Sequence, residues 1–147
     1  MKGRVRLREV RETDLPELYE HQLDPVATRM ADFPSRDRET FMAHWRTKVL
    51  ADPENVVRTI EYDGAVAGNI GSWRAGDERL VGYWIARAHW GKGIATRALA
   101  ELLTIVTERP LHASVAKHNA GSIRVLEKCG FARSGEDEGG YVMVLER

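Results

Sequence analysis

One segment near the middle of the chain restricts the possible folds more than any other. Residues 79–86 (RLVGYWIA) form an apolar run rich in aromatic and β-branched residues, which is typical of a strand in the interior of a sheet. Gly91 and Gly93 follow, and apolar residues then recur between Ile94 and Val106 at the spacing of a helix that buries one face. The segment predicts a strand, a loop and a helix at the centre of a mixed α/β fold.

Shorter segments on both sides complete the predicted order of elements. Strands are predicted at 4–10, 55–62, 65–73, 111–116, 131–136 and 141–145. Helices are predicted at 14–24, 26–30, 35–50 and 119–129, the third opened by Ser35. With no repeat or linker between these segments, we expect residues 1–147 to form a single domain.

Composition excludes several classes of protein. The chain has 147 residues, 43% of them apolar, which is enough for a hydrophobic core and argues against disorder. Its 22 basic and 22 acidic side chains cancel, so no nucleic-acid or membrane partner is expected. The longest apolar stretch is too short to span a bilayer, and the first residues lack a signal-peptide core. Cys129 is a single cysteine, so we expect no internal disulfide and a cytoplasmic location.

The loop after the central strand suggests a phosphate site. Two glycines at the start of a helix let successive backbone N–H groups converge where the helix dipole is positive, an arrangement that binds phosphate or pyrophosphate. Neither the GxxxxGK[ST] loop nor the GxGxxG fingerprint of other nucleotide folds is present. A plain turn between strand and helix is the alternative, and the glycines alone do not decide between the two.

The distribution of charge favours the phosphate site. Residues 79–100 and 109–126 contain no acidic residue. Their basic residues are Arg79, Arg87, Lys92, Arg97, Arg109, Lys117 and Arg124. Seven positive charges in two windows that flank the loop predict a site for a small polyanion, with chance clustering on a solvated surface as the alternative.

Two motifs in this order resemble those of a known family. WGKGIAT follows the apolar strand, and NAGSIRVLEKCGF begins at Asn119. Together they resemble the acetyl-CoA motifs of the GNAT acyltransferase superfamily, and most closely those of its ribosomal-protein N-terminal (Rim-type) acetyltransferase branch. Trp90 departs from the Gln or Arg usual in the wider superfamily. The resemblance implies a mixed, mainly antiparallel sheet of about seven strands with about four helices.

The same resemblance implies a set of site residues. It places the pantetheine arm of acetyl-CoA along the backbone of the central strand and the pyrophosphate on the amides of the loop. The implied cofactor-binding residues are Trp84, Ile85, Ala86, Arg87, Gly91, Lys92, Gly93, Ile94, Ala95, Thr96 and Asn119. Ser122 matches the serine that, in this branch, is a candidate to protonate the departing thiolate. Asn119 can also be the N-cap of its helix, with Ser122 at the third helical position.

The predicted activity is N-acetyl transfer to a primary amine by direct attack, through a tetrahedral intermediate whose oxyanion a strand amide near Ile85 would hold. In related enzymes a glutamate precedes the GYW strand, where this chain has Leu80. Glu78 lies two residues upstream on the same side of an extended strand and is the first candidate for the general base, with a solvated turn residue as the alternative. No His/Cys cluster has metal spacing, so no metal is expected.

Other readings stay open at this point. The missing glutamate fits a non-catalytic acyl-CoA-binding sensor, and the basic windows fit, less well, a nucleic-acid-binding module. Of Met30, Phe33, Phe41 and Trp45, we expect one or two to line the acceptor pocket. The acceptor amine, and the choice between monomer and homodimer, are not determined by the sequence.

Overall fold

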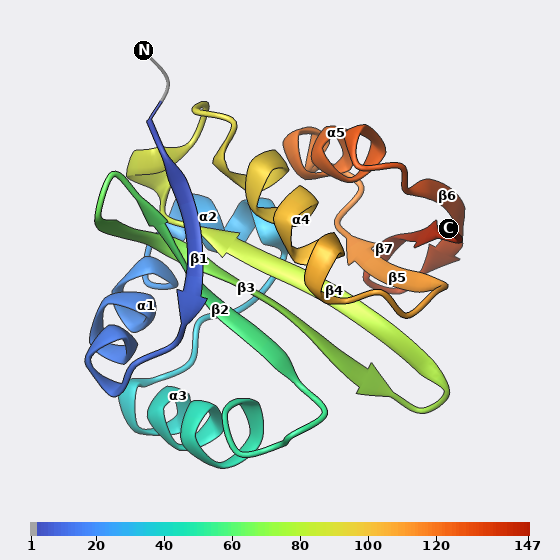
Figure 1. The fold of residues 1–147 in the computed structure, drawn as a ribbon. Helices are drawn as coiled ribbons and strands as arrows, with labels where there is room; N and C mark the ends of the chain where they lie inside the picture. The colour runs from blue at the N-terminus through green and yellow to red at the C-terminus, as the bar shows by residue number, and fades with distance from the viewer. Residues whose placement is uncertain (1–2) are drawn as a thin grey trace.

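A seven-stranded sheet runs through the computed structural model, which describes residues 3–147 (Figure 1). In chain order its strands are β1 (Val5–Glu9), β2 (Val56–Tyr62), β3 (Ala65–Ala75), β4 (Glu78–Ile85), β5 (Leu111–Val115), β6 (Ala132–Asp137) and β7 (Gly140–Leu145). The order across the sheet is β1-β2-β3-β4-β5-β7-β6, and every neighbouring pair is antiparallel except β4 and β5. The predicted α/β class and mainly antiparallel sheet are confirmed.

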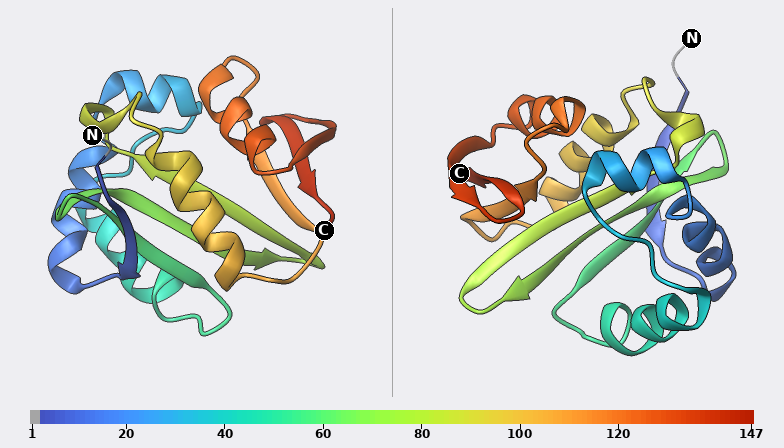
Figure 2. Two further views of the ribbon diagram at one scale, coloured as in Figure 1. Left: turned by 45° about the horizontal axis from the view of Figure 1, so that its top comes forward. Right: turned by 180° about the vertical axis from the view of Figure 1, so that it is seen from behind.

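Helices cover both faces of the sheet (Figure 2). The α-helices are α1 (Leu15–His21), α2 (Pro25–Ala31), α3 (Arg38–His44), α4 (Ile94–Ile105) and α5 (Ala120–Lys128). Shorter helical segments are η1 (Glu12–Asp14), a π-helical extension of α3 called η2 (Trp45–Val49), and η3 (Arg87–His89). Helices α4 and α5 lie on one face, and α1, α2 and α3 lie on the other.

Each face has its own hydrophobic core. Under α4, the side chains of Ile94, Ala98, Leu99 and Leu102 are buried against strand residues such as Ile60. On the opposite face, the buried residues are Leu15, Leu18, Phe41, Met42 and Trp45. The ring centroids of Phe41 and Trp45 are 5.7 Å apart. Both residues belong to the apolar face that the sequence spacing predicts, and this face is buried in the core on this side of the sheet.

Most predicted boundaries are correct to within a few residues. The third helix begins at Arg38, because the Asp37 carboxylate, 2.7 Å from the Thr40 N–H, is the N-cap in place of Ser35. Strand β3 continues to Ala75, so the β3–β4 turn is shorter than predicted and contains Gly76 at φ +63°. The described residues form five α-helices, in agreement with the five predicted ranges and close to the number of about four that the resemblance implies.

Strands β4 and β5 separate soon after they meet. They pair only through Arg79 with Leu111 and Leu80 with His112, at the start of both strands. Strand β4 then continues to Ile85, and its register there is with β3 alone. The edge of β4 that faces away from β3 is therefore open over the second half of the strand.

Candidate active site

The open edge of β4 forms the floor of a groove with a volume of about 560 Å³. Helix α2, the loop after β4, the first turn of α4 and the beginning of α5 surround it. Predicted site residues that line it are Trp84, Ile85, Gly91, Gly93, Ile94, Ala95, Thr96, Asn119 and Ser122. The structure thus brings together residues from both motifs, which are about 30 positions apart in the sequence.

The first turn of α4 offers backbone donors to this groove. Gly91 and Gly93 have φ of +79° and +74°, and a Cβ added at either would meet no atom within 4 Å. Among the described residues no side chain caps the helix, and the Arg97 N–H is bonded to the Gly93 carbonyl at 3.2 Å. The N–H groups that precede Arg97 in the first turn of α4 therefore have no carbonyl acceptor within the helix. They point beyond the helix end, where the dipole is positive. This cradle fits a pyrophosphate.

The backbone of β4 is only partly available to a ligand. Ala86 donates its N–H to the Ala67 carbonyl and accepts the His89 N–H, both at 2.8 Å. Because backbone direction alternates along an antiparallel strand, Trp84 also faces β3, whereas Ile85 faces the open edge. The prediction that Trp84 and Ala86 pair with the pantetheine arm is corrected for this reason. The backbone of Ile85 faces the open edge, and so does that of Tyr83, two residues earlier.

Trp90 has a structural reason to be present in this loop. Its indole Nε1 donates a hydrogen bond to the Ile85 carbonyl at 2.9 Å. That carbonyl faces the open edge of β4, where no strand satisfies it. Trp90, which departs from the superfamily pattern, therefore holds the loop against the end of β4. Because Trp90 binds the Ile85 carbonyl, the Ile85 N–H is the backbone group that stays available to a ligand at this edge.

A pair of hydroxyl groups lies on the α5 side of the groove. The Tyr83 hydroxyl is 2.5 Å from Ser122 Oγ, and both residues line the groove. Burial raises the pKa of Tyr83 to about 12, so the phenol keeps its proton throughout the neutral range. Asn119 is the N-cap of α5, with its side-chain oxygen 3.2 Å from the Ser122 N–H. The sequence prediction missed Tyr83, although strand alternation puts its hydroxyl on the buried face with Val81.

Glu78 and Arg87 lie away from the groove. Glu78 is the first residue of β4, five positions before Tyr83, and its carboxylate is 2.9 Å from His112 Nε2. At about 3.3 Å per residue, some 16 Å of strand separate it from Tyr83, which argues against Glu78 as the general base. Arg87 is exposed, and its guanidinium is 3.3 Å from Asp24 at the start of α2.

The basic windows are less concentrated in space than in sequence. Arg79 is buried and donates its Nε proton to Ser72 Oγ at 2.9 Å, and Lys117 pairs with Glu136 at 2.7 Å. Arg97 donates to the Gly3 carbonyl at 2.6 Å. Of the seven basic residues only Arg124 lines the groove, where Lys128 joins it. Several of these basic side chains are thus paired with carboxylates, or donate hydrogen bonds to carbonyl groups, from other parts of the chain.

The histidines and the cysteine near the groove make structural contacts. His118 Nε2 is 2.7 Å from the Arg29 carbonyl, and Cys129 Sγ is 3.7 Å from the Thr96 carbonyl, which links α5 to α4. Burial and the nearby charge of Lys92 lower the pKa of His89, which lines the groove, so its ring is neutral at pH 7.

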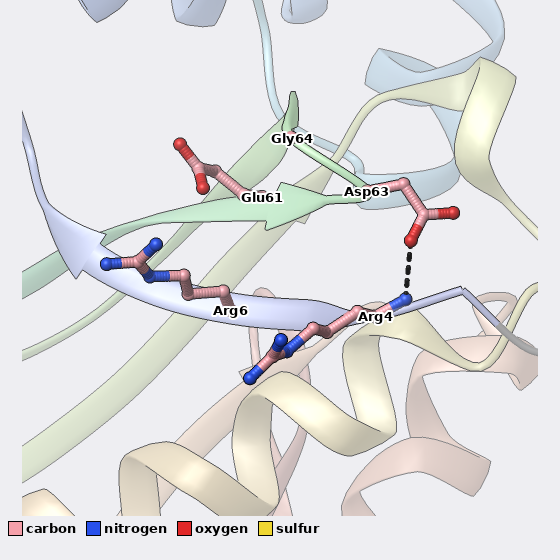
Figure 3. A pocket seen from close by; sticks show the side chains of 5 residues that line it. All are labelled: Arg4, Arg6, Glu61, Asp63 and Gly64. Atoms are coloured by element: carbon pink, nitrogen blue, oxygen red, sulfur yellow. Dashed lines mark hydrogen bonds between the residues drawn. The ribbon is translucent and has the colours of Figure 1, made fainter.

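A second depression of about 330 Å³ lies at the edge of the sheet (Figure 3). It is lined by Arg4, Arg6, Glu61, Asp63 and Gly64. The Arg4 N–H donates to the Asp63 carboxylate at 2.7 Å, and Glu61 accepts from Arg8. Both of its carboxylates are therefore engaged by donors from β1 or the residue before it, and none of the predicted site residues lines this depression.

Comparison with known proteins decides the family. The model of the acetyltransferase (GNAT) domain matches residues 4–132. The chain belongs to the GNAT acetyltransferase family. Within residues 3–147 no helix is long and apolar enough to cross a membrane.

Individual relatives agree with this assignment. The chain is 32% identical over 110 residues to the Bacillus subtilis protein named "Putative ribosomal N-acetyltransferase YdaF", covering 70% of this chain and 60% of that protein. It is 44% identical over 60 residues to "Probable N-acetyltransferase YjcK" of the same organism, or 38% and 33% of the two chains. The fold matches the aminoglycoside acetyltransferase AAC(6')-Ib crystallised with coenzyme A at a TM-score of 0.82 and 22% identity, over 98% and 95% of the chains.

Proposed function

We propose that this protein is an acetyl-CoA-dependent N-acetyltransferase that acts on a primary amine by direct attack. The observation that carries the proposal is the uncapped first turn of α4, which shares a groove with the Tyr83–Ser122 hydroxyl pair and the open edge of β4. A phosphate cradle, a free strand edge and a donor pair near its end are the three parts that such a reaction needs.

Each part of the groove has a role in binding the acyl donor. The amides of Gly91 to Thr96, with Lys92 contributing its backbone, would hold the pyrophosphate. Tyr83 and Ile85 present their backbone to the open edge and would pair with the pantetheine arm as an added strand does. Asn119 would hydrogen-bond the donor while it caps α5. Arg124 and Lys128 add positive charge along α5.

The groove can then stabilise the changes of charge in the reaction. Acetyl-CoA supplies an activated acetyl thioester. The Ile85 N–H would stabilise the negative charge that develops on the carbonyl oxygen as the new C–N bond forms. As the C–S bond breaks, Tyr83 and Ser122 would donate hydrogen bonds to the sulfur. Because a thiol has a pKa near 8.5 and Tyr83 one of about 12, the phenol would keep its proton and stabilise the thiolate as a hydrogen-bond donor, and the proton that the amine nitrogen loses would balance the one that the thiolate gains from solvent.

The attacking amine must be neutral before it reacts. No Asp or Glu side chain of residues 3–147 lines the groove, so the groove offers no carboxylate to take this proton. An α-amine with a pKa of about 8 is substantially neutral at pH 7.4, whereas a lysine of pKa about 10.4 is neutral only to about one part in a thousand. This favours acceptors with weakly basic amines.

The names of the relatives leave the acceptor open between two types. One relative is named for ribosomal acetylation, and a fold neighbour was crystallised with kanamycin. A protein N-terminus and a small-molecule amine are therefore both compatible with the proposal. Monomer and homodimer are equally compatible with it, and it calls for no nucleic-acid partner.

One observation favours a second candidate. A groove in which none of residues 3–147 supplies a carboxylate base also fits a domain that binds acyl-CoA without turnover. Release of coenzyme A thiol, measured with a panel of amines, separates the two functions. The proposal predicts amine-dependent release, and acetyl-CoA binding without release for any amine would establish the sensor instead.

A further inference from the structure

The two faces of β4 present different chemistry to the groove. Tyr83 points to α5, where it meets Ser122, and Trp84 points to the opposite face, where its indole Nε1 lies 3.3 Å from the His21 carbonyl. Because the edge of β4 is open, both side chains line the same groove. The donor would lie on the α4–α5 side, so the acceptor side is the one formed by Trp84 and α2.

We call the residues Ala27, Met30, Ala31 and Trp84 the α2 wall, and all four line the groove. Phe33 extends this wall outward, with its ring edge-on to Trp84 at 6.1 Å and 42% of its surface exposed. Of the four residues among which one or two were expected at the acceptor pocket, Met30 lines the groove, whereas Phe41 and Trp45 are core residues.

The α2 wall is fixed at both ends. Asp24 caps α2 through the Val26 N–H at 2.9 Å and is 3.3 Å from the Arg87 guanidinium in the loop after β4. At the other end, His118 Nε2 contacts the Arg29 carbonyl at 2.7 Å and joins α2 to the turn before α5. The wall is therefore a preformed apolar surface held between the two motif loops.

The charge of the groove is the second observation. Its ionisable residues other than Tyr83 are His89, His118, Arg124 and Lys128, and within residues 3–147 no carboxylate lines it. Asp24, the N-cap of α2, is already engaged by a backbone amide and by Arg87. Asp32 follows α2 and is exposed outside the lining residues. A second ammonium group on an acceptor would find no anionic side chain on this wall, and Arg124 and Lys128 are the charged groups nearby.

We propose that the acceptor is a primary amine attached to an apolar or aromatic group and carrying no second positive charge. This rests on the proposed acetyltransferase function and adds the class of acceptor to it. Polyamines and aminoglycosides, which carry several ammonium groups, are then poor acceptors. The α2 wall and Phe33 bind the apolar group, and the reacting amine reaches the open edge of β4.

Two probes with the same four-carbon side chain test the proposal. L-Norleucinamide and L-lysinamide both carry an α-amine, and lysinamide adds an ammonium group at the end of the side chain. At about pH 8, where α-amines are largely neutral, total coenzyme A release should give a kcat/KM at least about tenfold higher for norleucinamide. Equal values, or a preference for lysinamide, would overturn the proposal.

Calorimetry of acetyl-CoA binding in the same preparation separates the two levels of inference. Absence of binding would contradict the proposed function itself. Binding without turnover of either amide would overturn the acceptor class and leave acyl-CoA binding in place. Binding with the expected preference supports both.

A charge placed on the α2 wall should shift the preference. In Met30→Glu, the kcat/KM for lysinamide divided by that for norleucinamide is expected to rise at least about tenfold. The matched control Met30→Gln should leave this ratio unchanged. Ala31→Asp, at the last residue of α2, provides a second variant if Met30→Glu does not fold. An unchanged ratio in a folded acidic variant would show that acceptors do not contact this wall.

Discussion

The two ends of strand β4 differ in how their edges are paired with neighbouring strands. At its beginning the strand is paired on both sides, Arg79 is buried against Ser72, and Glu78 contacts His112. At its end one edge is free, and the groove of the candidate active site begins there. Because the closed end is paired with both neighbouring strands, we assign it a role in stabilising the fold. The open end leaves donors without protein partners, and we assign it the function.

The largest effect is expected from a charge at the phosphate cradle. Gly93→Glu adds a carboxylate where the pyrophosphate would bind and should raise the Kd for acetyl-CoA by about 1000-fold, or about 4 kcal/mol. Gly76→Glu is the matched control at the closed end, since both glycines have positive φ and open space at Cβ. Calorimetry should show nearly unchanged binding for the control. Equal losses in the two variants would mean that backbone strain, not the site, causes the effect.

The next effect concerns the hydroxyl pair. Tyr83→Phe and Ser122→Ala each remove a donor to the departing sulfur and should lower kcat by about 10- to 100-fold, as expected for a hydrogen bond to a charged group. The Kd for acetyl-CoA should change by less than about twofold. Because the two groups touch, the double variant should lose less than the product of the single losses.

Ser134→Ala, at an exposed position of β6, is the control for this pair. Steady-state kinetics and calorimetry should show no change for it. Full kcat in Tyr83→Phe would leave the pair as a packing contact between β4 and α5.

A smaller effect is expected from pH. For an acceptor α-amine of pKa about 8, kcat/KM should rise about tenfold from pH 7 to pH 9, because the neutral fraction rises by that factor. It should then stay level to about pH 10, since the Tyr83 pKa of about 12 keeps the phenol protonated. A decline between pH 8 and pH 10 in the initial rates would reveal an acid that titrates in that range and contradict this assignment.

The smallest effect is expected at the closed end. Glu78→Gln should leave kcat/KM within about twofold, because Glu78 lies far along the strand from Tyr83 and contacts His112. A loss of tenfold or more in the same assay would restore Glu78 as the base and would remove the distinction between the two ends.

Much of this comparison was accessible from the sequence. The apolar run of β4 and the glycines after it predicted the strand, the loop and the helix, because periodicity and turn residues act locally. The N-cap role of Asn119 followed from local spacing in the same way. Met30 was among the residues expected at the acceptor pocket, and it lines the groove.

Features that depend on pairing between distant segments could not be predicted from the sequence. The side of an extended strand makes Glu78 a candidate base, but only the short β4–β5 register shows which end of that strand is open. The partnership of Tyr83 with Ser122 joins residues 39 positions apart. The clustering of basic residues was overestimated, since Asp24 and Glu136 come from distant segments to pair with two of them.

Backbone amide chemical shifts, recorded as acetyl-CoA is added, test the central assignment most directly. The account predicts large changes at the amides of Ile85, Gly91, Gly93, Ala95 and Thr96, and small changes at Arg79 and Leu80. Changes confined to the closed end of β4, or absent from the loop at saturating acetyl-CoA, would contradict it.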